Sequence, residues 1–220
     1  MRRAAPAVLL VLATSCADGA ETRSRSYPDG QPWSEIRLVQ GVADGRWRTW
    51  FENGQPKSDG EYRLGKRHGP WTTWWQSGAK QSEGEYRDGR QEGPWTYWFE
   101  SGKPASSGRF ERGVAQGAWT EWYGTGTKRA EVSYRDGLPD LVARTYHPNG
   151  ALNQERTFSQ GVLDGPCRDY REDGSELVIG EYVAGRRERL WLIFRRDGSV
   201  IRDLSGYFEN GVRVRPPPDE

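Results

Sequence analysis

Cysteine, methionine and histidine are scarce in this chain of 220 residues, which contains two Cys, one Met and two His. Two cysteines cannot build the disulfide framework that staples many small secreted domains. His68 and His147 are too few for most transition-metal sites, and neither a Cys-x-x-Cys nor a His-x-x-x-His spacing is present. We therefore expect no metal site, no cofactor and a fold that is held by packing and strand pairing.

Branched aliphatic residues are also few for a globular core. From Tyr27 onward the chain has 25 Val, Ile and Leu residues against 27 aromatic residues, whereas globular cores are built mainly from aliphatics. Glycine, with 28 residues, is nearly twice its average usage of about 7% and disfavours long helices. The 11 Trp residues argue against a disordered chain.

An excess of charge of either sign is missing as well. The 32 basic residues are balanced by 31 acidic residues, whereas nucleic-acid-binding proteins usually carry a clustered basic excess. We therefore expect no nucleic acid among the partners of this protein.

The N-terminus has the pattern of an export signal. A positive start, Met1–Arg3, precedes the apolar stretch Ala4–Ala13, which is too short to span a bilayer but long enough for a secretory signal. The following Leu12–Cys16 resembles a bacterial lipobox, so we expect a lipid on Cys16, with a plain signal peptide as the alternative. Ala17 after the cysteine implies an outer-membrane location in a Gram-negative organism.

The remainder of the chain repeats itself with a period of 24 residues. Glycine recurs at fixed phases, for example at Gly54, Gly78 and Gly102. Two aromatic columns lie three residues apart, and Trp75 belongs to a third column with Phe51 and His147. The first column contains Trp47, Trp71, Trp95 and Trp119, and the second contains Trp50, Trp74, Trp98 and Trp122. We select these eight tryptophans and Trp75 as candidate binding or structural residues.

Each period contains two strand-like runs and two turns. Residues 70–75 are rich in aromatic and β-branched residues, and residues 80–87 form the second run. The turn at Asn53-Gly54 is a strong hairpin signal, and residues 88–93 are expected to form the second loop. Side-chain alternation places the Trp71 column opposite the Trp74 column. Glycines such as Gly84 would let a neighbouring ring lie flat on bare backbone.

These units resemble the MORN repeat in its bacterial variant, with the pattern Gly-x-Trp-x-x-Trp/Tyr at Gly93, Trp95 and Trp98. The same pattern marks proteins named as YwqK-family antitoxins. The resemblance implies an all-β fold, namely an elongated, twisted, mostly single-layer antiparallel meander of β-hairpin repeats. It also implies a binding or assembly role, or neutralisation of a partner toxin.

The sequence therefore predicts four segments. Residues 1–15 are a lipoprotein signal peptide, and residues 16–26 are the lipidated cysteine and a flexible tether. Residues 27–211 are the array of about seven repeats with partial caps. Residues 212–220 are a disordered, proline-rich tail, because proline cannot donate to a strand ladder.

Catalytic chemistry has no candidate residues in this sequence, so we expect no enzyme. No Gly-x-Ser-x-Gly elbow appears. His68 lies in a column with Asp44 and Glu92, which we interpret as a loop position that accepts any polar residue. Cys167 replaces a tryptophan of the first column, which favours a small buried apolar residue over a reactive thiol.

Three functions remain open. The first is a lipid-anchored binding or scaffolding module for another envelope protein, because exposed aromatic residues suit interfaces. The second is an antitoxin or immunity role, which follows from the family name alone. The third is a cell-wall glycan binder, because tryptophan faces stack on sugar rings. For Trp50, Trp74, Trp98 and Trp122 we favour a purely structural role. Membrane contact is expected through the lipid anchor only.

Overall fold

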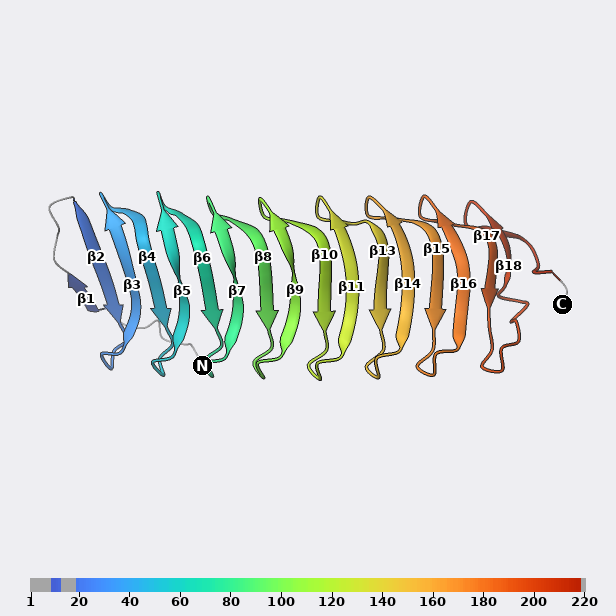
Figure 1. The fold of residues 1–220 in the computed structure, drawn as a ribbon, viewed down its shortest axis with the longest axis horizontal. Helices are drawn as coiled ribbons and strands as arrows, with labels where there is room; N and C mark the ends of the chain where they lie inside the picture. Colours follow the sequence, from blue (N-terminus) through green and yellow to red (C-terminus); the bar gives the residue numbers. More distant parts are fainter. Residues whose placement is uncertain (1–8, 13–18, 219–220) are drawn as a thin grey trace. The chain divides into compact units, whose positions relative to one another are not determined.

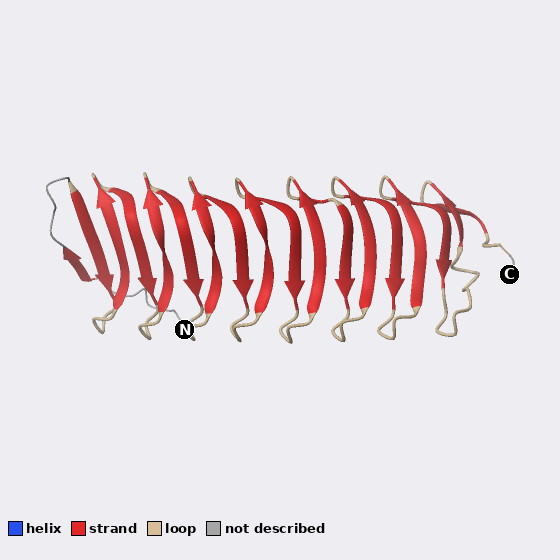
Figure 2. Cartoon of the chain, viewed as in Figure 1, coloured by secondary structure: helices blue, strands red, loops and turns tan. Residues whose placement is uncertain are grey.

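The computed structural model describes residues 9–12 and 19–218, which form strands and turns but no helix (Figure 2). Consequently, the described part of the chain offers no helix that could cross a membrane. The chain divides into two compact units. Unit 1 contains the described residues up to Pro104 and Phe110–Gly113, and unit 2 contains Ala105–Arg109 and the described residues from Val114 onward.

Unit 1 contains eight strands, and the residues of a ninth are divided between the units. The strands are β1 (Leu9–Leu12), β2 (Ala20–Ser26), β3 (Pro32–Val39), β4 (Val42–Trp50), β5 (Pro56–Arg63), β6 (Lys66–Trp74), β7 (Lys80–Arg87) and β8 (Arg90–Trp98), with β9 (Pro104–Glu111) as the divided strand.

Unit 2 contains the remaining strands of the described residues. They are β10 (Val114–Trp122), β11 (Lys128–Arg135), β12 (Leu138–Pro139), β13 (Leu141–Tyr146), β14 (Leu152–Ser159), β15 (Val162–Tyr170), β16 (Glu176–Val183), β17 (Arg186–Ile193), β18 (Gly206–Glu209) and β19 (Val212–Arg215).

Within each unit, strands that are neighbours in the chain lie side by side and pair antiparallel (Figure 1), except that β12 and β13 both pair with β11 and not with each other. The register repeats with the sequence, since Thr49 faces Ser58 and, 24 residues later, Thr73 faces Ser82. The prediction of an all-β antiparallel meander of hairpin repeats is therefore confirmed.

The tight turns lie where the sequence predicted a longer loop. Asp88 and Gly89 both have positive φ, 51° and 84°, as a two-residue type I′ hairpin requires. Residues 90–93 already belong to strand β8, so the predicted six-residue loop is wrong. The Asn53-Gly54 turn is the wider one, because only its glycine has positive φ and Phe51 bonds across it to Gln55.

Two segments that were expected to be flexible are strands. Residues 20–26 form β2 and pair with β3 from Ala20 to Ser26, although they contain no aromatic residue. Residues 212–215 form β19, in which Val212 and Arg213 pair with β18. Neighbouring strand edges offer unpaired backbone groups, and pairing with them orders polar segments that have no core of their own.

Tryptophans of the first column provide the core of each unit by lying on glycine. A Cβ atom added to Gly84 would lie 2.3 Å from the indole of Trp95, and one added to Gly60 would lie 2.1 Å from that of Trp71. Trp71 and Trp95 are only 3% and 2% exposed. The predicted stacking of rings on strand glycines is thus confirmed, and it buries tryptophan within a single layer of strands.

In unit 2, Cys167, Trp191 and Phe208 form a buried cluster, with Val178 and Tyr182 packed against it. Cys167 is 2% exposed, and burial raises the pKa of its thiol. The prediction that Cys167 is a small buried residue is therefore confirmed.

Candidate functional site: an aromatic groove on unit 1

Unit 1 has an open groove of about 800 Å³ that crosses strands β3 to β8. Its lining residues come from the same positions of successive repeats, so they form rows across the strands. The groove has one aromatic wall, a floor of hydroxyl groups and a second wall built from the wide turns. We call it the aromatic groove.

The first wall is a ladder of alternating indole and phenol rings. Trp47, Tyr62, Trp71, Tyr86 and Trp95 follow one another with ring centroids 5.1–5.7 Å apart and edge-to-face angles of 69–82°. This geometry is the favourable one for aromatic pairs. Trp71 and Trp95 are fixed by Gly60 and Gly84 beneath them, whereas Trp47 pairs with Ile36, and the half-buried tyrosines stand between the tryptophans.

The floor is a row of hydroxyl side chains on facing strands. Thr49 pairs with Ser58, Ser58 with Thr73, and Thr73 with Ser82. The hydroxyl oxygens of Thr49 and Ser58 are 2.6 Å apart, and those of Thr73 and Ser82 are 2.7 Å apart. Each pair needs one proton for the bond between them, so the side chains can also donate a second proton elsewhere.

The second wall depends on a bulge that the sequence pattern did not reveal. The register shifts between Thr49 and Trp50, so Thr49 faces Ser58 whereas Trp50 faces Pro56. The extra residue, Lys57, lines the groove beside Phe51, and its ammonium lies 5.5 Å from the centre of that ring. β-Bulges commonly redirect a side chain in this way.

The equivalent bulge one repeat later presents Gln81, whose carbonyl oxygen accepts a hydrogen bond from Thr73 at 3.1 Å. Trp75 continues the wall and is fixed by a hydrogen bond from its indole nitrogen to the carbonyl of Trp98. On this side the groove therefore has a phenyl ring and an ammonium group in one repeat, Phe51 and Lys57, and an indole and an amide in the next, Trp75 and Gln81.

Arg67 supplies a second cation to the groove. Its guanidinium lies 4.5 Å from the ring centre of Trp71 and donates to the hydroxyl of Tyr86 at 3.0 Å. Partial burial lowers the pKa of Arg67, but hydrogen bonds with Tyr62 and Tyr86 raise it by more, so its charge is secure. Within the described residues neither Lys57 nor Arg67 forms an ion pair with a carboxylate.

Trp50 of the second column lies with Arg46 and Arg48 on the face opposite Trp47, as the alternation predicted, whereas Trp74 also lines the aromatic groove. Trp50 and Trp74 line a smaller hollow of about 240 Å³ with Arg46, Arg48 and Asp59. Arg48 lies over the ring of Trp50 at 5.7 Å. These rings are half-buried, and no aromatic ladder connects them.

The other candidate tryptophans are distributed in the same two ways. Trp98 is half-buried under Lys80, whose ammonium lies 5.2 Å from its ring. In unit 2, Trp119 lies on Gly108 and contacts Tyr134 edge-on, whereas Trp122 is half-buried at the end of β10. Only Trp47, Trp71, Trp74, Trp75 and Trp95 of the candidates line the groove.

One polar column was misinterpreted in the sequence. Asp44, Glu92 and their equivalents lie in strands, except Asp140, which lies between β12 and β13. Each accepts a hydrogen bond from the backbone N–H of a turn residue about 20 positions later. The acceptors are Asp44, Glu92, Gln116, Asp140, Asp164 and Glu188. Apart from His68, all members of the column are Asp, Glu or Gln, and all three residue types carry an acceptor oxygen. This restriction was the sequence signal for a hydrogen-bonding role.

His68 is the exception in this column. Its Nδ1 atom is buried without a hydrogen-bond partner and lies 3.9 Å from the carboxylate of Asp88. In the repeat where this column carries Gln116, the amide bonds to both the N–H and the carboxylate of Asp136. His68 therefore does not form the hydrogen bonds to the following turn that Gln116 forms in its own repeat.

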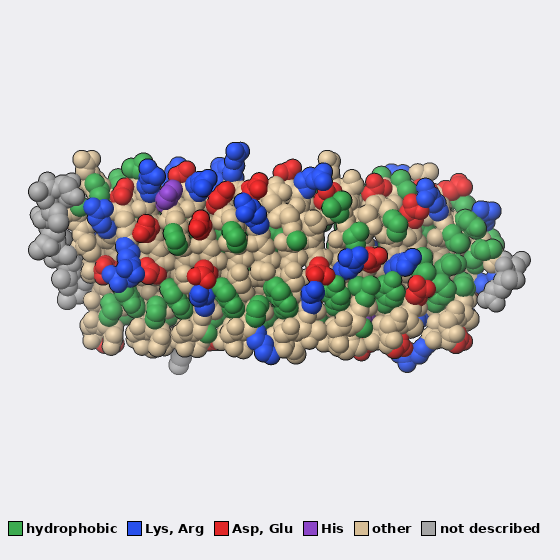
Figure 3. Space-filling view, viewed as in Figure 1, with side chains coloured by type: hydrophobic (Ala, Val, Ile, Leu, Met, Phe, Trp, Pro, Cys, Tyr) green, Lys and Arg blue, Asp and Glu red, His purple; other side chains and the backbone are tan. Residues whose placement is uncertain are grey.

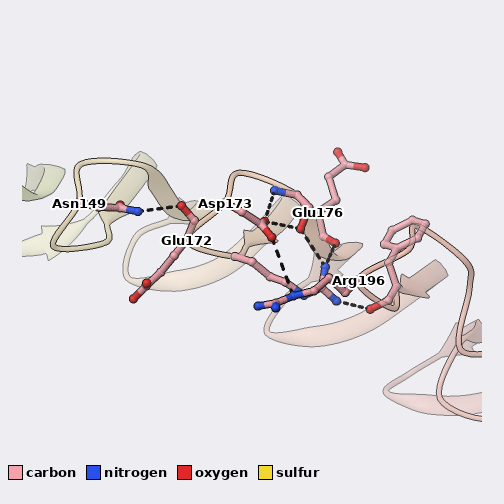
Figure 4. A network of polar contacts seen from close by, with 8 residues as sticks. Asn149, Glu172, Asp173, Glu176 and Arg196 are labelled. Atoms are coloured by element: carbon pink, nitrogen blue, oxygen red, sulfur yellow. Dashed lines mark hydrogen bonds and ion pairs between the residues drawn. The ribbon is translucent and has the colours of Figure 1, made fainter.

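Members of the third aromatic column that carry a polar group tie neighbouring repeats together through the wide turns. Tyr27, Trp75, Tyr123, His147 and Arg171 each bond through the side chain to a backbone carbonyl 23 residues later. In unit 2 the arrangement extends to the turn itself, as Figure 4 shows for the bond from Asn149 to the carbonyl of Glu172 and for Arg196 facing Asp173. The side chain of His147 is thus a structural one.

No group of three or more His, Cys, Asp or Glu side chains within the described residues could hold a metal ion. Basic and acidic side chains are interspersed on the face drawn in Figure 3. Cys16, the expected lipidation site, and most of the expected signal peptide lie outside the described residues.

Together, these features define a repeat protein of antiparallel β-hairpins with a groove built from equivalent positions. Four segments of the chain match the family model described as MORN repeat variant, at residues 43–63, 67–88, 91–111 and 139–160. The chain therefore contains MORN-type repeats, and the first three matches include the ring ladder of the groove. No curated protein matches the chain.

Proposed function

We propose that this protein is a non-catalytic binding module that holds a segment of another protein in the aromatic groove. The observation that carries the proposal is the groove itself, with its aromatic walls, its hydroxyl floor and two cations without carboxylate partners. Aromatic and arginine side chains are enriched where protein interfaces gain most of their energy. The ladder rings are already ordered by edge-to-face contacts with one another and, for Trp71 and Trp95, by stacking on glycine, so binding costs little side-chain entropy.

A lipid on Cys16 would place this module at a bacterial envelope membrane, at the outer membrane in a Gram-negative organism. The lipobox-like segment Leu12–Cys16 supports this part of the proposal. Only three residues separate Cys16 from the first residue of β2, Ala20. The lipid would therefore hold the sheet within about 10–15 Å of the membrane surface, and the membrane would be contacted through the lipid alone.

Crosslinking in the native cells tests the binding function. A tagged chain and its Thr49→Glu variant are crosslinked, and the proteins that they retain are compared. Glu121 occupies the same column as Thr49 in unit 2, so the repeat tolerates glutamate there, and Glu121→Thr is the matched control. We expect Thr49→Glu to lose a partner that the native chain and Glu121→Thr both retain.

The identity of that partner separates scaffolding from immunity. A component of a secretion or division complex favours scaffolding, whereas one dominant toxic protein, whose toxicity the native chain suppresses, favours the antitoxin role. A partner retained equally by all three chains would show that the aromatic groove is not the binding site.

Glycan binding is the second candidate, because rings next to hydroxyl and amide groups also suit sugars. Sedimentation with purified peptidoglycan tests it. A chain that stays in the supernatant excludes this function, whereas pelleting that Thr49→Glu abolishes supports it.

Metabolic labelling with palmitate tests the anchor. The label is expected in the native chain and should vanish in Cys16→Ala. Labelling that persists in this variant would show that the lipid is not on Cys16.

A further inference from the structure

We propose that the ligand of the aromatic groove is a proline-rich, acidic segment of a partner protein in the polyproline II conformation. This inference rests on the proposed binding function and specifies the chemistry of the partner. It is carried by the spacing of the groove, its hydrogen-bonding groups and its charge.

The spacing of the groove follows from the hairpin repeat. Equivalent groove residues, such as Thr49 and Thr73 or Trp47 and Trp71, lie two strands apart. Neighbouring strands are about 4.8 Å apart, so equivalent positions recur about every 9.6 Å along the groove. A ligand that uses every repeat in the same way needs a matching period.

Among regular peptide backbones, polyproline II matches this period. It has three residues per turn and rises about 3.1 Å per residue, which gives about 9.3 Å per turn. An extended strand repeats about every 6.7 Å, and an α-helix has a pitch of about 5.4 Å. Every third residue of a polyproline II ligand would therefore meet an equivalent position of the groove.

The chemistry of the groove fits the same backbone. Polyproline II makes no internal hydrogen bonds, so its carbonyl groups are available as acceptors. The Thr49–Ser58 hydroxyl pair can donate one proton outward, and the amide nitrogen of Gln81 is available because its oxygen accepts from Thr73. Proline rings pack against the aromatic walls, as in other aromatic-lined grooves that bind proline-rich segments.

The chain itself contains a comparable contact. In unit 2, the guanidinium of Arg202 donates to the carbonyls of Pro217 and Pro218 at 3.3 and 3.2 Å. The chain's own proline run is thus held within unit 2.

Charge complementarity specifies the acidic residues of the ligand. Lys57 and Arg67 line the groove together with a single carboxylate, that of Glu100. A ligand carboxylate would pair with Lys57 or Arg67 through charge-assisted hydrogen bonds, which are stronger than hydrogen bonds between neutral groups.

Synthetic peptides of the repeating triplet Pro-Pro-Glu test the inference, with binding to the full chain followed by tryptophan fluorescence. The groove crosses six strands, or about 24 Å, which about eight polyproline II residues span. Affinity should rise as the peptide grows from one triplet to three and then level off. Peptides of Pro-Pro-Lys should bind at least about tenfold more weakly, because the attraction to the two cations becomes repulsion.

Two variants locate the binding. Arg67→Gln introduces the residue that occupies the same column at Gln91 and should weaken Pro-Pro-Glu binding about tenfold. Arg187→Gln is the matched control, because Arg187 lies over Trp191 in unit 2 as Arg67 lies over Trp71. Its affinity should equal that of the native chain.

The outcomes separate this inference from the proposed function. If Pro-Pro-Glu peptides do not bind while the crosslinked partner still depends on Thr49, the polyproline II ligand is wrong and the binding module stands. The polyproline II ligand is also wrong if chitin oligosaccharides bind in an Arg67-dependent manner and the peptides do not. If the crosslinked partner is independent of Thr49 and the peptides also fail, both proposals are wrong.

Discussion

Replacing Gly84 by alanine removes the space in which the indole of Trp95 lies. The new Cβ atom would lie 2.3 Å from two atoms of the ring, a distance that no relaxation of the methyl group itself can relieve. The ring is 2% exposed and its nitrogen bonds to the carbonyl of Glu85 at 3.1 Å. Trp95 must therefore leave its position, and the sheet loses most of the burial of this side chain.

The expected cost is about 2–4 kcal/mol in the free energy of unfolding. Removing a buried tryptophan side chain typically costs about 3–5 kcal/mol. The backbone of Gly84 has no positive φ, so alanine itself is allowed there and returns about 0.5–1 kcal/mol of backbone entropy. The ring displacement outweighs that gain.

Urea unfolding followed by far-ultraviolet circular dichroism measures this cost, and near-ultraviolet dichroism reports the packing of the ring. Gly124→Ala is the matched control, because Gly124 also lacks a positive φ and has no atom within 4 Å of an added Cβ. Equal unfolding free energies for the two variants would refute the conclusion that the ring of Trp95 packs on Gly84.

Three further predictions concern single side chains. His68→Gln should raise the free energy of unfolding by about 0.5–1.5 kcal/mol, since it provides an acceptor for the next turn, and an unchanged or lower midpoint in urea would contradict this. Burial raises the pKa of Cys167, so in a Cys16→Ala chain a thiol reagent at neutral pH should react only after denaturation, and immediate reaction in buffer would show that the Cys167 thiol is accessible. Burial and a hydrogen bond to Glu131 raise the pKa of Tyr146 from 10.0 to about 12. Because the neutral phenol is favoured in the fold, its contribution to stability is complete below about pH 10 and should be lost between about pH 10 and about 12. Tyr146→Phe should lose this part of the pH dependence, and identical profiles for both chains would count against it.

The repeat and its strand pairing could be predicted from the sequence because both depend on local periodicity. Glycine at a fixed phase predicts a turn, and the 24-residue period then fixes which strands are neighbours. The turn types were assigned less well. Leu64, Asp88 and Arg112 all adopt positive φ before a glycine, although leucine and arginine give no turn signal of their own.

The glycine column of Gly84 and the tryptophan column of Trp95 vary together in the sequence, but only the structure explains why. Gly84 precedes Trp95 by 11 residues, and the same spacing in a later repeat joins Val132 to Ala143. A large residue thus replaces glycine where the tryptophan is replaced by alanine. The physical cause is that both side chains compete for one space, which the sequence alone does not define.

The aromatic groove could be predicted only in part. The rings of Trp47, Trp71 and Trp95 were selected from the sequence, whereas the hydroxyl floor and Arg67 were not. Serine, threonine and arginine are common on strands, so their presence carries no signal until cross-strand register aligns them. The bulge that turns Lys57 into the groove depends on how two strands pair and has no local sequence signature.

The sequence by itself determined an all-β repeat of hairpins, because turn glycines and strand periodicity act over a few residues. It also determined that aromatic rings occupy both faces, since alternation is a property of a single strand. Only the tertiary structure decided which rings are buried, that Asp44 and its equivalents support the next turn, and where the groove runs. Those outcomes depend on contacts between residues about 10 to 23 positions apart, which exist only once the strands have paired.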